Sequence, residues 1–157
     1  MKMLGGFPAS DRWRIARHAV AAYKACLAAG EPFEAHEALE VAWRDPEGPL
    51  GQDAVARALI QVAAAYVHLS RGHPDGARRL RSRARERLLS AVESGLDESG
   101  RARTVTRWEG LGVDLPRVLG ALRTWPEDPR AWPGPGHIPG LDDGEGSQAE
   151  ADPGGCA

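Results

Sequence analysis

The residues best suited to chemistry lie in a short segment that reads FEAHEALEVAWR over residues 33–44. On an α-helix, which turns about 100° per residue, His36, Glu37 and Glu40 fall on one face. An imidazole beside two carboxylates can bind a divalent metal ion or, in the absence of a metal, transfer protons. The same pattern is also typical of the solvated face of an amphipathic helix.

A second group of polar residues, Arg57, Gln61 and His68, is spaced by four and seven positions in an otherwise apolar stretch. This spacing places the three on one face of a helix. A buried polar side chain without a hydrogen-bond partner costs a few kcal/mol, so we expect this face to meet polar residues of another helix. If the two faces meet, they form either a structural hydrogen-bond network or a central pocket for a small polar ligand. The predicted ligand-binding residues are His36, Glu37, Glu40, Arg57, Gln61 and His68.

A divalent metal ion is one candidate cofactor. His36 and Glu40, four residues apart, can bind one ion from a single helix, and His68 can add a third ligand from a facing helix. The spacing is similar to the HExxH motif of zinc proteases with the second histidine replaced by glutamate. If the protein is an enzyme, it would carry out acid–base or metal-assisted hydrolytic chemistry. The sequence contains no nucleophile elbow, phosphate-binding glycine loop or dinucleotide fingerprint.

Arginines are concentrated between residues 71 and 87. The helix face that these arginines form has two interpretations. It is either an ordinary solvated surface or the partner-binding surface of a non-catalytic interaction module. In the second case the His/Glu/Gln cluster would be purely structural. All but two of the 20 Lys and Arg residues are arginines, which indicates a compositional bias, and the formal net charge is −2. The composition therefore gives no strong nucleic-acid signal, and the partner would be a small ligand or a protein. The arginines concerned are Arg71, Arg78, Arg79, Arg81, Arg83, Arg85 and Arg87.

The elements that must position these residues are helices. Apolar residues recur every three or four positions, helix-capping residues such as Ser10 and Asp114 precede two of the segments, and Gly or Pro separates them. The predicted helices cover residues 10–30, 32–44, 52–71, 74–92 and 97–108, with a short helix after Asp114. No alternating strand pattern occurs, so we predict an all-α, compact antiparallel bundle of five or six helices.

The chain divides into three parts by composition. We expect a flexible N-terminus at residues 1–9, a helical bundle domain at 10–123, and a Pro/Gly-rich, largely disordered tail at 124–157. Trp125 and Trp132 can pin the first part of that tail across the bundle, because aromatic rings bury large areas.

A cytoplasmic location is expected from three features of the sequence. The two cysteines, Cys26 and Cys156, offer neither a disulfide framework nor a CxxC metal site, which favours a reducing compartment. Residues 1–7 lack the pattern of a signal peptide, and no apolar run approaches 18 residues, which gives no support for a membrane association.

The segments FEAHEALEVAWR and ALIQVAAAYVHLSRGHPDGARRL together resemble the signature of the family known as domain of unknown function 309. The resemblance covers roughly residues 14–122 and implies a compact helical fold without an assigned activity. We interpret Trp43 as a core aromatic residue and Gly72 and Gly76 as structural glycines of a turn. The family's motif positions correspond to His36, Glu37, Glu40, Trp43, Gln61, His68, Gly72, Gly76 and Ala77.

Overall fold

A computed structural model describes residues 9–100 and 102–142. The α-helices in these ranges are α1 (Ala9–Ala28), α2 (Pro32–Arg44), α3 (Ala54–Ser70), α4 (Pro74–Glu93), α5 (Arg103–Gly110) and α6 (Leu115–Thr124). The described residues form no β-strand, and their one extended pairing is an isolated bridge between Leu96 and Ala102. The all-α prediction with six helices is therefore confirmed.

Capping residues explain where the long helices begin and end. Asp53 precedes α3 and accepts hydrogen bonds from the backbone N–H groups of Val55 and Ala56, at 2.8 and 3.0 Å. After α3, Gly72 adopts a left-handed conformation with φ of 78°, and His73 N–H donates to the carbonyl of His68 at 2.8 Å. This is the glycine-based helix stop that the sequence signals at this turn.

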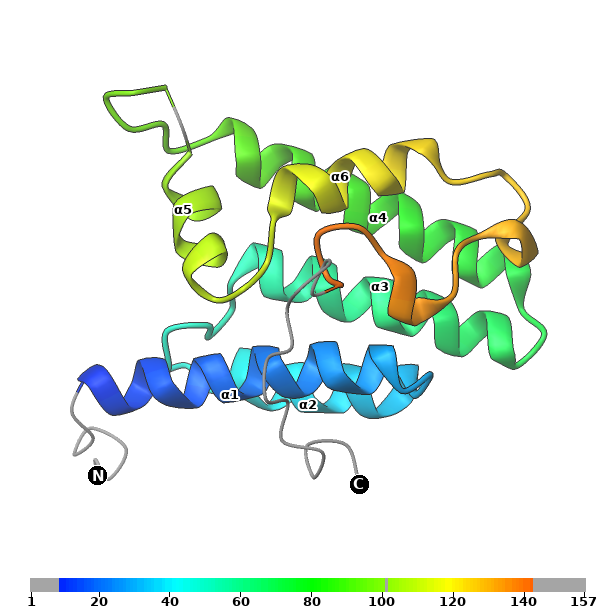
Figure 1. Cartoon of the computed structure of the whole chain (residues 1–157), viewed down its shortest axis with the longest axis horizontal. Helices are drawn as coiled ribbons and strands as arrows, with labels where there is room; N and C mark the ends of the chain where they lie inside the picture. The colour runs from blue at the N-terminus through cyan, green and yellow to red at the C-terminus, as the bar shows by residue number, and fades with distance from the viewer. Residues whose placement is uncertain (1–8, 101, 143–157) are drawn as a thin grey trace.

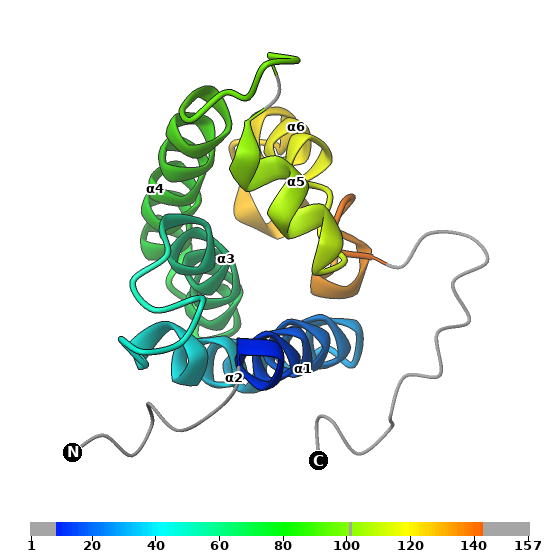
Figure 2. The ribbon, with the colours of Figure 1, turned by 90° about the vertical axis from the view of Figure 1, so that its left-hand side faces the viewer.

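Helices α1 to α4 run back and forth in alternating directions, and α1 packs on α2, α2 on α3, and α3 on α4 (Figure 1). Viewed end-on, these four helices form a bent layer, and α5 and α6 lie inside its angle (Figure 2). The core contains fully buried large side chains from all six of these helices. They include Tyr23 and Leu27 of α1, Leu59 of α3, Trp108 of α5 and Leu122 of α6.

The prediction of a helix over residues 97–108 is wrong for the first half of that range. Asp97 instead closes a turn, since its carboxylate accepts from the N–H and hydroxyl of Ser99 and its carbonyl accepts from Gly100 N–H. Gly100, with φ of 82°, then turns the chain into α5, which begins at Arg103. Local side-chain hydrogen bonds of aspartate compete with helix formation, which accounts for the difference.

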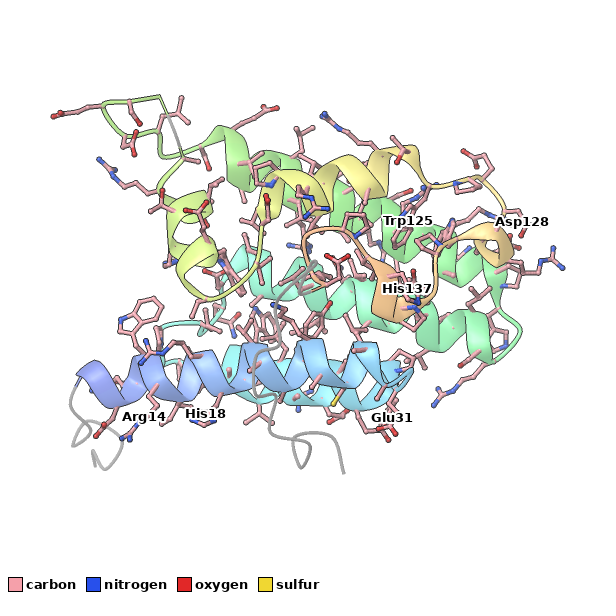
Figure 3. All side chains as sticks on the ribbon, in the orientation of Figure 1. Arg14, His18, Glu31, Trp125, Asp128 and His137 are labelled. Carbon is pink, nitrogen blue, oxygen red and sulfur yellow. The ribbon has the colours of Figure 1, made fainter. Side chains whose placement is uncertain are left out.

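The chain that follows α6 packs across the bundle. Trp125, Trp132, Ile138 and Leu141 are buried there, and short 3₁₀ helices form at Pro129–Ala131 (η2) and Pro135–His137 (η3). Figure 3 shows Trp125 and His137 on this segment, in front of α3 and α4. The packed part of the chain thus continues past the boundary expected at residue 123, and residues 143–157 lie outside the described residues.

No helix in the described ranges is both long enough and apolar enough to span a lipid bilayer.

Candidate functional site

Helix α2 brings His36, Glu37 and Glu40 together as its spacing predicts. His36 Nδ1 lies 3.2 Å from Glu40 Oε2 and 3.5 Å from Glu37 Oε1. One potential ligand atom from each residue lies within 4.8 Å of the other two. The side chains of His36 and Glu40 are 25% and 16% exposed, and that of Glu37 is 54% exposed. The cluster therefore lies at the surface, with Glu40 its most sheltered carboxylate.

Neighbours on the same helix fix the orientation of this cluster. Arg44 Nη2 lies 2.6 Å from Glu40 Oε1, so the two oxygens of Glu40 face a guanidinium and an imidazole. The Phe33 ring lies nearly parallel to the His36 ring, at 6.4 Å between centroids and 11° between planes. Both contacts span three or four residues, the spacing at which helical side chains meet.

Helix α3 adds a second polar row beside α2. The guanidinium of Arg57 lies over the Trp43 ring at 5.2 Å. Helices α2 and α3 are antiparallel neighbours (Figure 1). Gln61 follows Arg57 by one turn and Glu40 precedes Trp43 by about one turn, so the helical rise from the Arg57–Trp43 contact brings Gln61 and Glu40 to a similar level. The sequence-predicted residues of α2 and the first half of α3 thus border one seam between two helices.

Three of the six buried polar side-chain atoms that make no hydrogen bond within the described residues belong to α2 and α3. His36 Nδ1, Trp43 Nε1 and Gln61 Oε1 are buried atoms that make no hydrogen bond with the described part of the chain. The close approach of His36 Nδ1 to Glu40 Oε2 lacks the angular geometry of a hydrogen bond. Buried polar groups normally have partners, so these three atoms remain available to a further hydrogen-bond partner.

His68 lies apart from the His36 cluster, at the turn between α3 and α4. Its side chain is exposed, and its ring faces that of His73 at 6.0 Å between centroids. A Cβ atom added to Gly76 would lie 2.5 Å from His68 Nδ1. His68 is not among the residues whose ligand atoms converge with His36. The close approach at Gly76 and the positive φ of Gly72 give both glycines a role in shaping this turn.

The arginines of α4 do not form one uniform face. Arg81 is buried, and its Nη1 donates to the carbonyls of Leu122 and Trp125, both at 3.2 Å. Its guanidinium also lies over the Trp132 ring at 5.5 Å. Burial, together with the nearby Arg85, lowers the pKa of Arg81. Arg81 therefore joins α4 to the end of α6, while neighbours such as Arg79 and Arg83 are exposed.

Three surface hollows are described, and none is lined by the six predicted ligand-binding residues. The smallest, of about 70 Å³, lies between α1 and the loop after α2. A second, of about 380 Å³, lies among Arg78, Arg79, Arg83 and Arg85. The predicted central pocket does not correspond to any of the three.

The largest of these three hollows, of about 690 Å³, involves residues that, apart from Arg87, the sequence analysis did not select. It lies where α3 begins, α4 ends and α5 begins, at the left-hand end of Figure 1. We call it the basic groove. The spacing of residues in the sequence does not predict this groove, because its residues come from three separate segments of the chain. Its polar lining includes Asp53, Arg87, Ser90, Arg103, Thr104 and Arg107.

Comparison with known proteins supports the resemblance seen in the sequence. Residues 17–80 match the family model described as "Domain of unknown function (DUF309)". The matched segment contains α2, α3 and the start of α4, and so includes the whole His/Glu/Gln seam and the turn at His68. Neither the curated proteins nor the solved structures contain a significant match to the chain.

Proposed function

We propose that this protein binds a divalent metal ion at the seam between α2 and α3, through His36, Glu37 and Glu40. The observation that supports this best is the convergence of one imidazole nitrogen and two carboxylate oxygens within 4.8 Å. Imidazole and carboxylate ligands suit Zn²⁺ and other first-row divalent ions such as Mn²⁺. Three protein ligands near the surface leave coordination positions for water or a small polar molecule.

The unpaired Gln61 Oε1 supports a polar ligand beside the metal. It is buried, level with Glu40 on the facing helix, and lacks a partner in the described ranges. An amide oxygen in this position can accept a hydrogen bond from a metal-bound water. His68, which the sequence suggested as a third ligand, is not one of the proposed ligands, because its ring lies against His73 and its ligand atoms are not in the His36 cluster.

The test is metal binding by protein purified without an affinity tag, measured by elemental mass spectrometry and by calorimetric titration with Zn²⁺ and Mn²⁺. We expect His36→Ala and Glu40→Gln to weaken binding by more than about tenfold while the circular dichroism spectrum stays helical. His18→Ala is the matched control, because His18 is an exposed histidine on α1 (Figure 3). No binding by the wild-type chain, or equal losses in the control, would refute the proposal.

A second candidate function is docking of an acidic partner on the exposed arginines of α4. The hollow of about 380 Å³ lined by Arg78, Arg79, Arg83 and Arg85 supports it, although Glu86 and Glu127 also line that hollow. Its test is binding of a short polyglutamate peptide to the wild type and to an Arg79→Glu, Arg83→Glu double variant. Arg81 must be left intact, because it is buried under α6.

A further inference from the structure

The basic groove has the chemistry of an anion site. Arg87 of α4 and Arg103 and Arg107 of α5 line it, and Asp53 is the one carboxylate in its lining. The guanidinium of Arg107 pairs with the Asp53 carboxylate. No carboxylate in residues 9–100 or 102–142 forms an ion pair with Arg87 or Arg103, so two guanidinium charges border the groove without compensation.

The helix ends around the groove add to this positive potential. Helix α3 begins at Ala54 and α5 at Arg103, and both first residues line the groove. The backbone N–H groups at the start of a helix carry partial positive charge, equivalent to roughly half an elementary charge. Asp53 caps α3 by accepting from Val55 and Ala56, whereas the N-cap of α5 is Ala102, which makes no side-chain hydrogen bond. No carboxylate caps the start of α5, so its partial positive charge is not offset there as it is at α3. The N–H groups of Arg103 and Val105 already donate to the carbonyls of Gly95 and Ala102, so this end adds positive potential to the groove and these two groups are not free donors.

The rest of the lining indicates the size and type of ligand. The hydroxyl-bearing residues Ser90, Ser94 and Thr104 can donate hydrogen bonds to oxyanions, and Ala54, Val55 and Ala91 provide an apolar side. A volume of about 690 Å³ lies within the range of pockets that hold small organic molecules. Guanidinium groups match the geometry of phosphate oxygens and bind them through paired hydrogen bonds.

We propose that the basic groove binds a small phosphate ester, with its phosphate between Arg87, Arg103 and the start of α5 and its organic part against Ala54 and Ala91. This site is separate from the seam at His36. Its residues lie on α4, α5 and the first turn of α3, so either site can function when the other does not. Binding weakens as salt concentration rises, because exposed guanidinium groups are screened.

Calorimetric titration with AMP, adenosine and inorganic phosphate tests this proposal on the full chain. AMP should bind, adenosine should bind at least about tenfold more weakly, and Arg87→Gln and Arg103→Gln should each weaken AMP binding by about tenfold or more. Arg17→Gln is the matched control, because Arg17 is exposed on α1, a helix that contributes no residue to the lining of the groove. His36→Ala should leave AMP binding unchanged, which separates this site from the metal proposal.

Three results would overturn the proposal: no binding of AMP or inorganic phosphate, equal binding of AMP and adenosine, or an unchanged affinity in both arginine variants. Inorganic phosphate binding as tightly as AMP would show that the groove recognises the free anion, and would overturn the ester assignment. Arg107 is not altered in these variants, because it pairs with Asp53 at the cap of α3 and its loss would disturb the fold.

Discussion

The hydroxyl of Tyr66 on α3 donates a 2.6 Å hydrogen bond to the backbone carbonyl of Pro133, 67 residues later in the chain. Around this bond, the Tyr66 ring contacts Trp125 and Trp132 edge-on, at 5.8 and 6.1 Å between centroids. Trp132 Nε1 donates to the carbonyl of Pro126 at 2.8 Å. These contacts hold a segment rich in Pro and Gly against the bundle, and aromatic burial offsets the entropy of ordering it.

Both tyrosines of the chain should resist ionisation while the protein is folded. Burial raises the pKa of Tyr23 and of Tyr66 above the ordinary value of 10.0. Unfolding restores the ordinary pKa, so their contribution to stability is complete below pH 10 and declines as the pH rises above it. Absorbance at 295 nm should therefore show little tyrosinate in the folded chain at pH 10.5 and about 1.5 tyrosinates per chain in urea. If one tyrosine of the native protein ionises near pH 10, that tyrosine is not buried in solution. The variants Tyr23→Phe and Tyr66→Phe identify which of the two it is.

Arg81 should be far more important for stability than its neighbour Arg83. Arg81→Ala removes two hydrogen bonds to the end of α6 and leaves the carbonyls of Leu122 and Trp125 without those donors, so we expect a loss of about 2–4 kcal/mol in the free energy of unfolding. Arg83→Ala, at an exposed position of the same helix, should change it by less than about 0.5 kcal/mol. Urea denaturation measures both. Similar values for the two variants would show that Arg81 does not join α4 to α6.

Gly76 and His68 should show a strong energetic coupling. In the wild type, Gly76→Ala places a methyl group 2.5 Å from His68 Nδ1, which we expect to cost about 1–3 kcal/mol. In a His68→Ala background the same substitution should instead stabilise α4 by up to about 1 kcal/mol, because alanine favours helices over glycine. A double-mutant cycle by urea denaturation gives the coupling directly. If the two substitutions change the free energy of unfolding additively, the His68 side chain does not pack against Gly76 in solution.

Arg44 should compete with a metal ion for Glu40. Its guanidinium lies 2.6 Å from Glu40 Oε1 and adds a positive charge beside the three proposed ligands. If the metal proposal holds, Arg44→Gln should raise the affinity for Zn²⁺ several-fold, with a small loss of stability from the last turn of α2 of about 0.3–1 kcal/mol. Calorimetric titration of Arg44→Gln with Zn²⁺ measures this effect, with His36→Ala as the variant expected to lose affinity. Weaker binding after Arg44→Gln would contradict this arrangement of charges.

The sequence by itself determined the features that depend on near neighbours in the chain. Apolar periodicity, Asp114 as a cap, and Gly30 and Gly72 as stops located most of the helices, because helix formation and capping act over a few residues. The same short range explains the cluster on α2, where His36, Glu37 and Glu40 meet by helical spacing alone.

Only the tertiary structure decided which polar residues face the interior and which segments come together. Arg81 and Arg83 belong to the same arginine-rich stretch of α4, yet Arg81 is buried because α6 and Trp132 pack over its position. Residues 124–142 have the composition of a tail but pack on α1, α3 and α4, since a few aromatic contacts offset their ordering entropy. The basic groove forms because α5 folds back beside the first turn of α3, a contact between positions about fifty residues apart that no local pattern encodes.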